Sequence, residues 1–362
     1  MLAMLRLWHH RYFSDPQAVI LTLLLLTGAL VLVFFGRMLA PLLTAIIIAY
    51  LLEGPIAWME ERLGVRRLVG VSCVLALFFL LVLVSALTVF PVLWTQLADL
   101  LKEIPHYLAR GQQVLLNLPE RYPVITEEQV RELVGTIRNQ VGALGQHVLA
   151  ISLASVVNII TLLVYLVLVP FLVFFLLKDK DLIMNWISLR LPRERGAAQD
   201  LWRDLDAQMG NYVRGKFWEI LIVGGITFIS FTILRVDYAV LLATLTGLSV
   251  LVPYVGAVVV TIPVLLVGYF QWGVGSELAW LLIAYGIIQT LDGNVLNPLL
   301  FAKAVNLHPV AIIGAILIFG GLWGFWGIFF AIPLATLVNA LIITWPRNPD
   351  PEEEEAQAQP GG

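Results

Sequence analysis

The chain of 362 residues is 60% hydrophobic and only 13% charged, with a net charge of −3. A soluble protein carries about a quarter charged residues, so the composition excludes an ordinary soluble domain and indicates an integral membrane protein. The basic residues are dispersed, which excludes a nucleic-acid-binding patch, and the single cysteine, Cys73, excludes an intramolecular disulfide and a site built from several cysteines.

The N-terminal part is predicted to cross the membrane three times. Ala18–Phe35 is apolar and about 27 Å long as a helix, close to the thickness of the hydrocarbon core. It is too long for the apolar region of a signal peptide, and no cleavage site follows it. We expect a turn at Gly36–Arg37, a returning span over Met38–Leu52, and a third span over Leu68–Leu93.

A long polar section follows the third span. Apolar residues recur at helical spacing over Trp94–Leu108 and again over Val130–Val148, which predicts two amphipathic helices outside the membrane. They pack either on each other and on the ends of their own spans, or on neighbouring subunits. We favour packing on neighbouring subunits.

The C-terminal half is predicted to hold further spans over Leu149–Leu177, Phe217–Leu234 and the shorter Leu278–Leu291. An amphipathic stretch over Trp202–Val213 is expected to lie along the membrane surface. The basic residues of the short loops place the N-terminus in the cytoplasm. The predicted units are residues 1–93, an extracytoplasmic section 94–148, a transport unit 149–345, and a disordered acidic tail 346–362.

Two apolar stretches are interrupted in the middle. The segment 238–270 carries the break Val252–Gly256, and the segment 309–344 carries the break Gly320–Gly327. Backbone that leaves the helix at membrane depth must face protein or a water-filled cavity, because lipid offers no hydrogen bonds. Paired broken segments are typical of the binding site of a transporter.

A polar island, Gln289–Pro298, lies between the two broken segments, and Asp292 is its strongest candidate. An ionisable residue at membrane depth costs about 2.5–3.5 kcal/mol, so it indicates function, although Asp292 could equally cap a helix. The predicted substrate or ion path comprises Asp292, Gln289, Asn294, Asn297 and Tyr254. The predicted hinges or helix breaks are Pro253, Gly256, Pro298, Gly320, Gly321, Gly324, Gly327 and Pro333.

Several of these residues have a plainer interpretation. Glu219 and His308 are candidate proton carriers, but we favour a Glu219 side chain that extends to the headgroups and an interfacial His308. Gly320 and Gly324 also fit a small-residue pattern for close helix packing.

Motifs of catalysis are absent from the sequence. It contains no HExxH, no GxSxG and no GxxxxGK[ST]. We therefore expect no enzyme, no cofactor, no metal site and no ATP-driven transport by this chain alone.

The broken segments resemble a known family. VPYVG at Val252–Gly256, QTLDGNVLNPLLFAKAVNLHPV at Gln289–Val310 and GGLWGFWGIFFAIPLA at Gly320–Ala335 are similar to the signature of AI-2E family transporters. Where the family usually has Gly-Gln before the fifth span, this chain has Gly215–Lys216. The resemblance implies a bacterial cytoplasmic-membrane protein with about eight membrane segments, assembled as a homo-oligomer, in particular a pentamer. It also implies export of the signal autoinducer-2, or sodium–proton antiport in some members.

The sequence thus predicts an all-α polytopic membrane protein with two broken or re-entrant helices and an outer amphipathic section. Its first predicted function is the export of a small hydrophilic metabolite or signal by alternating access. Two alternatives stay open: a cation–proton antiporter with proton or sodium coupling, and a membrane scaffold or receptor that recruits partners through its outer helices.

Overall fold

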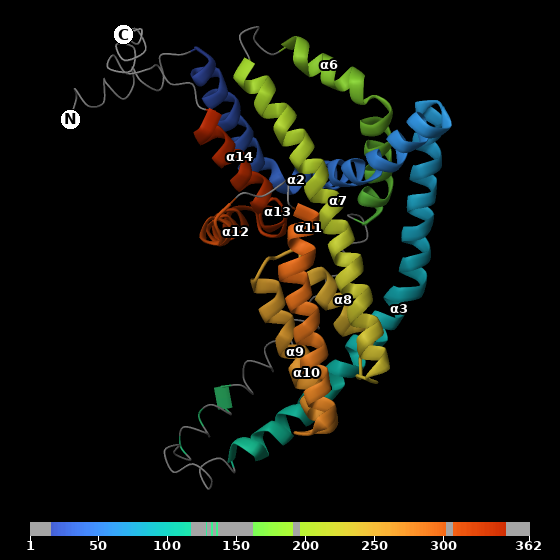
Figure 1. Ribbon diagram of the computed structural model, residues 1–362, viewed down its shortest axis with the longest axis vertical. Coiled ribbons are helices and arrows are strands. Elements are labelled where there is room, and N and C mark those ends of the chain that lie inside the picture. The colour runs from blue at the N-terminus through green and yellow to red at the C-terminus, as the bar shows by residue number, and fades with distance from the viewer. Residues whose placement is uncertain are drawn as a thin grey trace, which may run out of the picture.

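The computed structural model describes residues 16–116, 162–190, 196–301 and 307–344, with isolated helical positions at 128, 132, 135 and 136. Within these residues every regular element is a helix, which confirms the predicted all-α class (Figure 1). Five of the helices are long and apolar enough to cross a membrane, or six when one bent pair is counted as a single span. This agrees with a multi-pass membrane protein.

The predicted turn at Gly36–Arg37 is wrong. Helix α2 runs without interruption from Pro16 to Leu63, over 48 residues, so the first two predicted spans belong to one helix of about 72 Å. A single glycine costs a helix only about 1 kcal/mol. In lipid that cost is smaller than the cost of leaving backbone groups without hydrogen bonds. The helix contains Pro41 and Pro55, and its direction changes along its length (Figure 1).

Helix α3 (Arg67–Leu116) continues past the predicted end of the third span. The first outer helix, Trp94–Leu108, is therefore helical as predicted, but it lies within the C-terminal half of α3 and is not a separate helix. It packs on its own chain: the Gln96 side chain accepts a hydrogen bond of 2.8 Å from the Leu241 backbone N–H. The second outer helix, Val130–Val148, falls almost entirely outside the described residues.

Helices α2 and α3 form a bundle with the helix Leu162–Lys178, the described part of the fourth predicted span. Arg67 joins the three, because it forms ion pairs of 3.0 Å with Glu53 and Glu60 of α2 and donates hydrogen bonds to the carbonyl of Leu177. The chain then bends by 78° into α6 (Lys180–Arg190).

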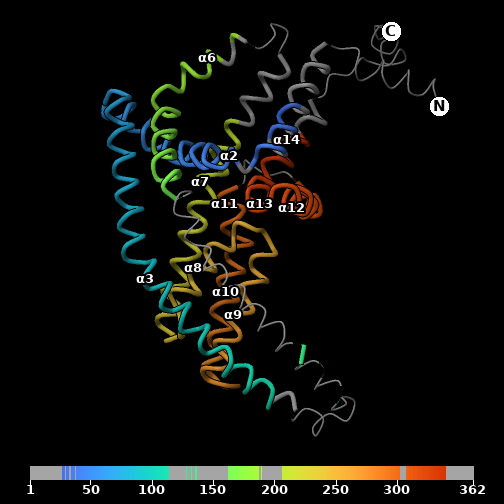
Figure 2. Tube along the Cα trace, turned by 180° about the vertical axis from the view of Figure 1, so that it is seen from behind, coloured from blue at the N-terminus to red at the C-terminus, as the bar shows by residue number. Residues whose placement is uncertain are grey.

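Helix α7 (Gly196–Ile233) passes through the middle of the molecule (Figures 1 and 2). It contains both the fifth predicted span and the amphipathic stretch Trp202–Val213. That stretch is therefore not a separate helix on the membrane surface. Tyr212 and Val213 at its end are buried in the protein core, where they contact α11, α12 and α13.

The first broken segment is a hairpin that turns back on itself. Helix α8 (Ala239–Ser249) leads away from the end of α7, and α9 (Val255–Trp272) returns to the same end. Gln271 closes the base: its Oε1 accepts a hydrogen bond of 2.9 Å from the backbone N–H of Asp237, and its Nε2 donates one of 2.8 Å to the carbonyl of Arg235. The two ends of the segment are therefore adjacent, and the segment does not cross in one direction.

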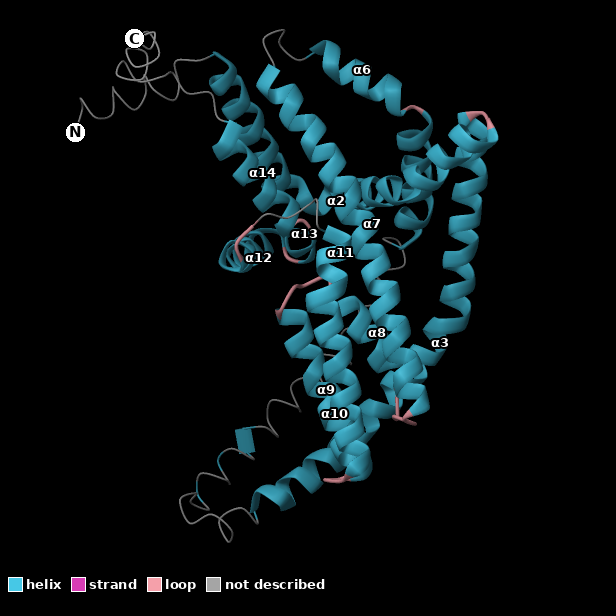
Figure 3. Cartoon of the chain, viewed as in Figure 1, coloured by secondary structure: helices cyan, strands magenta, loops and turns pink. Residues whose placement is uncertain are grey.

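After the hairpin, α10 (Ser276–Leu291), the π-helical turn η1 (Asp292–Leu296) and α11 (Asn297–Phe301) run in one line toward the centre. The second broken segment consists of α12 (Pro309–Trp323), α13 (Phe325–Phe329) and α14 (Ala331–Thr344). Short non-helical connections separate these helices in Figure 3. Residues 345–362, including the acidic tail, lie outside the described residues.

Candidate functional site

The tip of the α8–α9 hairpin is shaped by the predicted break. Residues 250–254 leave the helix, and Tyr254 adopts a φ of 62°, which is strained for a residue other than glycine. At Gly256, in the first turn of α9, the backbone passes so close to α8 that an added Cβ would collide with the Ser249 carbonyl. The sharp reversal therefore depends on the absence of a side chain at Gly256.

The polar island faces this tip as a π-helical turn and not as a loop. Asp292 is the C-cap of α10 and the first residue of η1, and with 9% of its surface exposed it is buried away from bulk solvent. A π-turn inserts an extra residue and aims side chains differently from an α-helix, and such turns occur frequently at functional sites.

A cavity of about 580 Å³, here called the hairpin-tip cavity, lies between the tip, η1 and α7. Its volume is in the range of small-molecule sites. Helices α12 and α14 each contribute one apolar residue to its wall, Ile312 and Ile332. The charged and amide side chains that line it are Lys216, Glu219, Gln289, Asp292 and Asn297.

Three ionisable residues meet at the wall of this cavity. Lys216 and Glu219 stand one helical turn apart on α7, and their Nζ and Oε2 atoms are 2.7 Å apart, with side chains only 4% and 1% exposed. The carboxyl group of Asp292 lies close to that of Glu219, and both are near the Lys216 ammonium group. Lys216 also donates a hydrogen bond of 2.8 Å to the Val250 carbonyl at the hairpin tip.

A chain of polar contacts leads from the hairpin to the cavity. The Thr261 and Tyr285 hydroxyls are 3.2 Å apart, and Gln289 Nε2 donates to the Tyr285 hydroxyl at 2.7 Å. This fixes the Gln289 amide at the cavity wall.

Comparison with known proteins agrees with this architecture. A family model described as "AI-2E family transporter" matches residues 20–347. The chain belongs to the AI-2E family of transporters.

Its relatives have the same extent. PerM of Escherichia coli K12, which carries the name of a permease, is 46% identical over 347 residues, covering 96% of this chain and 98% of PerM. YrrI of Bacillus subtilis, named as a transport protein, is 28% identical over 84% of this chain and 85% of its own length. A Thermotoga maritima protein that is described as a transport protein is 24% identical over 90% of this chain and 93% of its own length.

The transporter gathers most of the predicted path residues at one cavity. Gln289, Asp292, Asn297 and Tyr254 all line the hairpin-tip cavity, as do the predicted break residues Pro253 and Pro298. Their functional roles remain predictions.

Two predicted residues lie elsewhere. Asn294 is exposed, is not among the residues that line the cavity, and donates a hydrogen bond of 2.9 Å to the Thr290 carbonyl of its own helix. His308 caps α12, where its Nδ1 accepts a hydrogen bond of 3.3 Å from the Val310 N–H. It is exposed and lines neither of the two cavities described for this transporter.

The favoured interpretation of Glu219 as a side chain at the headgroups is wrong. Its residue is 1% exposed and its carboxyl group points to Lys216 and Asp292 inside the protein. Sequence reasoning missed Lys216 as a member of the site. The available signal was the spacing: an oppositely charged pair three residues apart, at the start of an apolar span, can form a pair on one helix face.

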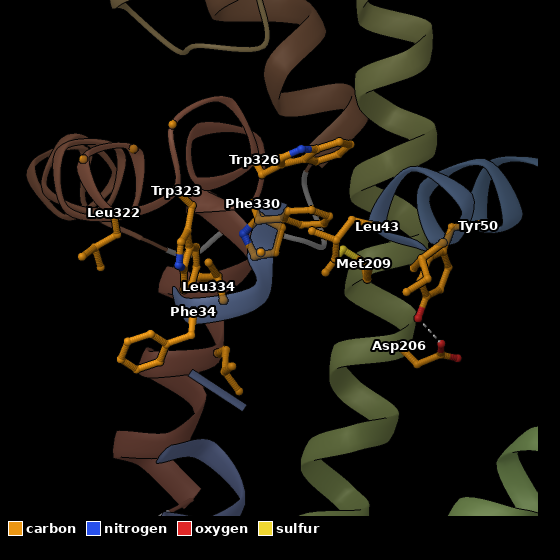
Figure 4. A pocket seen from close by; sticks show the side chains of 17 residues that line it. Phe34, Leu43, Tyr50, Asp206, Met209, Leu322, Trp323, Trp326, Phe330 and Leu334 are labelled. Carbon is orange, nitrogen blue, oxygen red and sulfur yellow. Dashed lines mark hydrogen bonds between the residues drawn. The ribbon is translucent and has the colours of Figure 1, made fainter. Parts of the chain in front are cut away.

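The second break borders a different cavity, of about 1020 Å³, between α2, α7 and α12–α14. Figure 4 shows its aromatic wall with Trp323, Trp326 and Phe330, and at one end the hydrogen bond of 2.6 Å from the Tyr50 hydroxyl to Asp206. The predicted hinge residues that line it are Gly320, Gly321, Gly324 and Pro333.

Gly327 is also required by its surroundings, since a Cβ there would collide with the Phe319 carbonyl. Gly324 has a φ of 61° between α12 and α13. Within the described part of the chain, no group of three metal-binding side chains occurs.

Proposed function

We propose that this AI-2E family protein is a secondary transporter that moves a small hydrophilic solute through the hairpin-tip cavity by alternating access. Export of a metabolite or signal of the autoinducer-2 type is the first choice. The observation that carries the proposal is a cavity of about 580 Å³ lined by Lys216, Glu219, Gln289, Asp292 and Asn297, within helices that are apolar enough to cross a membrane.

The lining suits a polyhydroxylated solute. Such a molecule needs several hydrogen-bond donors and acceptors in place of water, and buried polar groups are tolerated only when they are paired. The amides of Gln289 and Asn297 offer both donors and acceptors, and the carboxyl groups offer acceptors. A purely apolar molecule would leave these groups without partners.

Alternating access needs two bodies that meet at the site. The wall of the cavity combines α7, the hairpin and α10–α11 with Ile312 of α12 and Ile332 of α14. Leu251 and Val252 of the hairpin tip pack against the same core as α12 and α13. A small rotation of the second broken segment on this apolar contact, around Gly324, opens or closes one side of the cavity.

Cation–proton antiport is the second candidate. It is favoured by the proximity of the Glu219 and Asp292 carboxyl groups, because acidic side chains carry protons in many membrane transporters. We propose further that the protein lies in the bacterial cytoplasmic membrane with its N-terminus in the cytoplasm. A homo-oligomer would cover the apolar face of α3, where Leu80, Leu87 and Phe90 are exposed.

The test is flux of small metabolites and of sodium in proteoliposomes under imposed proton and sodium gradients. Asn297→Ala removes an amide that lines the cavity, and we expect at least a tenfold loss of flux, or about 1.4 kcal/mol. Asn294→Ala is the matched control, because it removes the same side chain three positions earlier, outside the cavity. Equal effects of the two variants would contradict the placement of the path in this cavity.

A further inference from the structure

The ammonium group of Lys216 lies where a bound cation is expected in a transporter of this architecture. Its Nζ donates to the carbonyl of Val250, which is the residue that ends the half-helix α8. The C-terminal end of a half-helix carries partial negative charge, and exposed carbonyls at such ends bind sodium in transporters with broken helices.

The remaining surroundings of the ammonium are also those of a cation site. Glu219 Oε2 lies 2.7 Å from Nζ, and the ring of Phe301 is centred 5.0 Å from it. An aromatic face attracts a cation, more strongly when water is excluded. Gly215 permits this arrangement, since a Cβ there would lie 2.7 Å from the Phe301 ring.

The ammonium group of Lys216 does not pair with every carboxyl oxygen near it. Both Glu219 Oε2 and Asp292 Oδ1 are buried. Glu219 Oε2 is paired with the Lys216 ammonium group, whereas Asp292 Oδ1 accepts no hydrogen bond from any residue that the structure describes. Glu219 is 1% and Asp292 9% exposed. One cation therefore faces two carboxyl groups, and Asp292 keeps an oxygen that is free to coordinate an ion.

We propose that Lys216 is a tethered cation that fills a monovalent-cation site formed by the Val250 carbonyl, Glu219 and Asp292. While the ammonium group is in place, sodium does not bind there. Removal of the ammonium group opens the site to sodium. The role of the site in transport rests on the proposed function, but its occupancy does not.

The consequence for coupling is specific. A tethered ammonium supplies the positive charge that a bound sodium ion would supply, so the wild-type cycle needs no sodium at this position. Protons remain free to exchange on the Glu219 and Asp292 carboxyl groups. The cavity is then a proton-coupled or uncoupled site in the wild type and becomes sodium-sensitive only by mutation.

The test is sodium binding to the full-length protein purified in detergent, measured by equilibrium binding of radioactive sodium and by thermal unfolding in NaCl and in choline chloride. We expect Lys216→Met to bind sodium saturably, with a Tm that is roughly 3 °C or more higher in NaCl than in choline chloride. The wild type should show neither effect. Lys102→Met is the matched control, because Lys102 also pairs with a carboxylate three residues away, but at the surface, with 75% of its side chain exposed.

A second variant covers a failure of Lys216→Met to fold. Lys216→Gln keeps a donor for the Val250 carbonyl while it removes the charge, and it should also gain sodium binding. Adding Asp292→Asn to either variant should lower that binding at least tenfold. Saturable sodium binding by the wild type that Asp292→Asn removes would overturn the proposal, as would a folded Lys216 variant that binds none. If the Lys216 variants gained sodium binding while the Asn297→Ala variant kept normal flux, the result would count against the proposed function alone.

Discussion

Gly256→Ala is the sharpest perturbation of the hairpin tip, since one methyl group tests whether the reversal of the chain depends on close backbone contact. An added Cβ would overlap the Ser249 carbonyl oxygen and lie 2.7 Å from its carbon. Overpacking costs about 1–3 kcal/mol, and the upper end applies because a backbone carbonyl cannot rotate away as a side chain can. The general gain from replacing glycine in a helix is about 1 kcal/mol, so the net loss of stability is about 2 kcal/mol.

The assay combines thermal unfolding in detergent with flux in proteoliposomes. For a loss of about 2 kcal/mol we expect Tm to fall by roughly 4 °C and flux to fall at least about tenfold, because a displaced tip moves Val250 and Tyr254 in the cavity wall. Gly286→Ala is the control within α10, where a Cβ meets nothing within 4 Å, and its Tm should be equal or higher. If Gly256→Ala matched the wild type in Tm and flux, the reasoning about the tip would be refuted.

Three other changes test separate features of the site. Tyr254→Gly removes a residue with a φ of 62°, and we expect a gain of about 1 kcal/mol in the free energy of unfolding, whereas a fall in Tm would mean that the tyrosine ring contributes more than the strain costs. Gln271→Ala removes both hydrogen bonds at the base of the hairpin. Hydrogen exchange at the Asp237 amide should become about tenfold faster, which corresponds to a loss of about 1.4 kcal/mol in the free energy of local opening. Unchanged protection would show that packing alone holds the base. Asp292→Asn removes one of two carboxyl groups that share a single ammonium group. Tm should therefore stay equal or rise, while proton-driven flux is lost. A large fall in Tm with normal flux would show that Asp292 has a structural role.

The breaks were predictable because glycine and proline act locally. Helices are interrupted within both predicted breaks, at residues 250–254 and at Gly324. The same local rule failed at Gly36–Arg37, where α2 continues. A single glycine among good helix formers does not offset the hydrogen bonds that a turn would lose in lipid.

The site was predictable in part. Asp292 was identifiable because a carboxyl group deep in an apolar region is costly and must have a partner. The partner was not identifiable, since Glu219 and Lys216 lie on α7, far from Asp292 in the sequence. Glu219 near the start of a span is compatible with a side chain that reaches the headgroups until the neighbouring helices are known to cover it.

The sequence by itself determined that the protein lies in a lipid bilayer, that it is helical, and that its helices are interrupted in two places. Composition decides the first two points, and glycine and proline act locally to decide the third. Only the tertiary structure decided that 238–270 turns back, that the two breaks border different cavities, and that Lys216, Glu219 and Asp292 meet. These outcomes depend on which helix faces cover one another, and burial by distant segments sets the cost and the pairing of every charge inside the membrane.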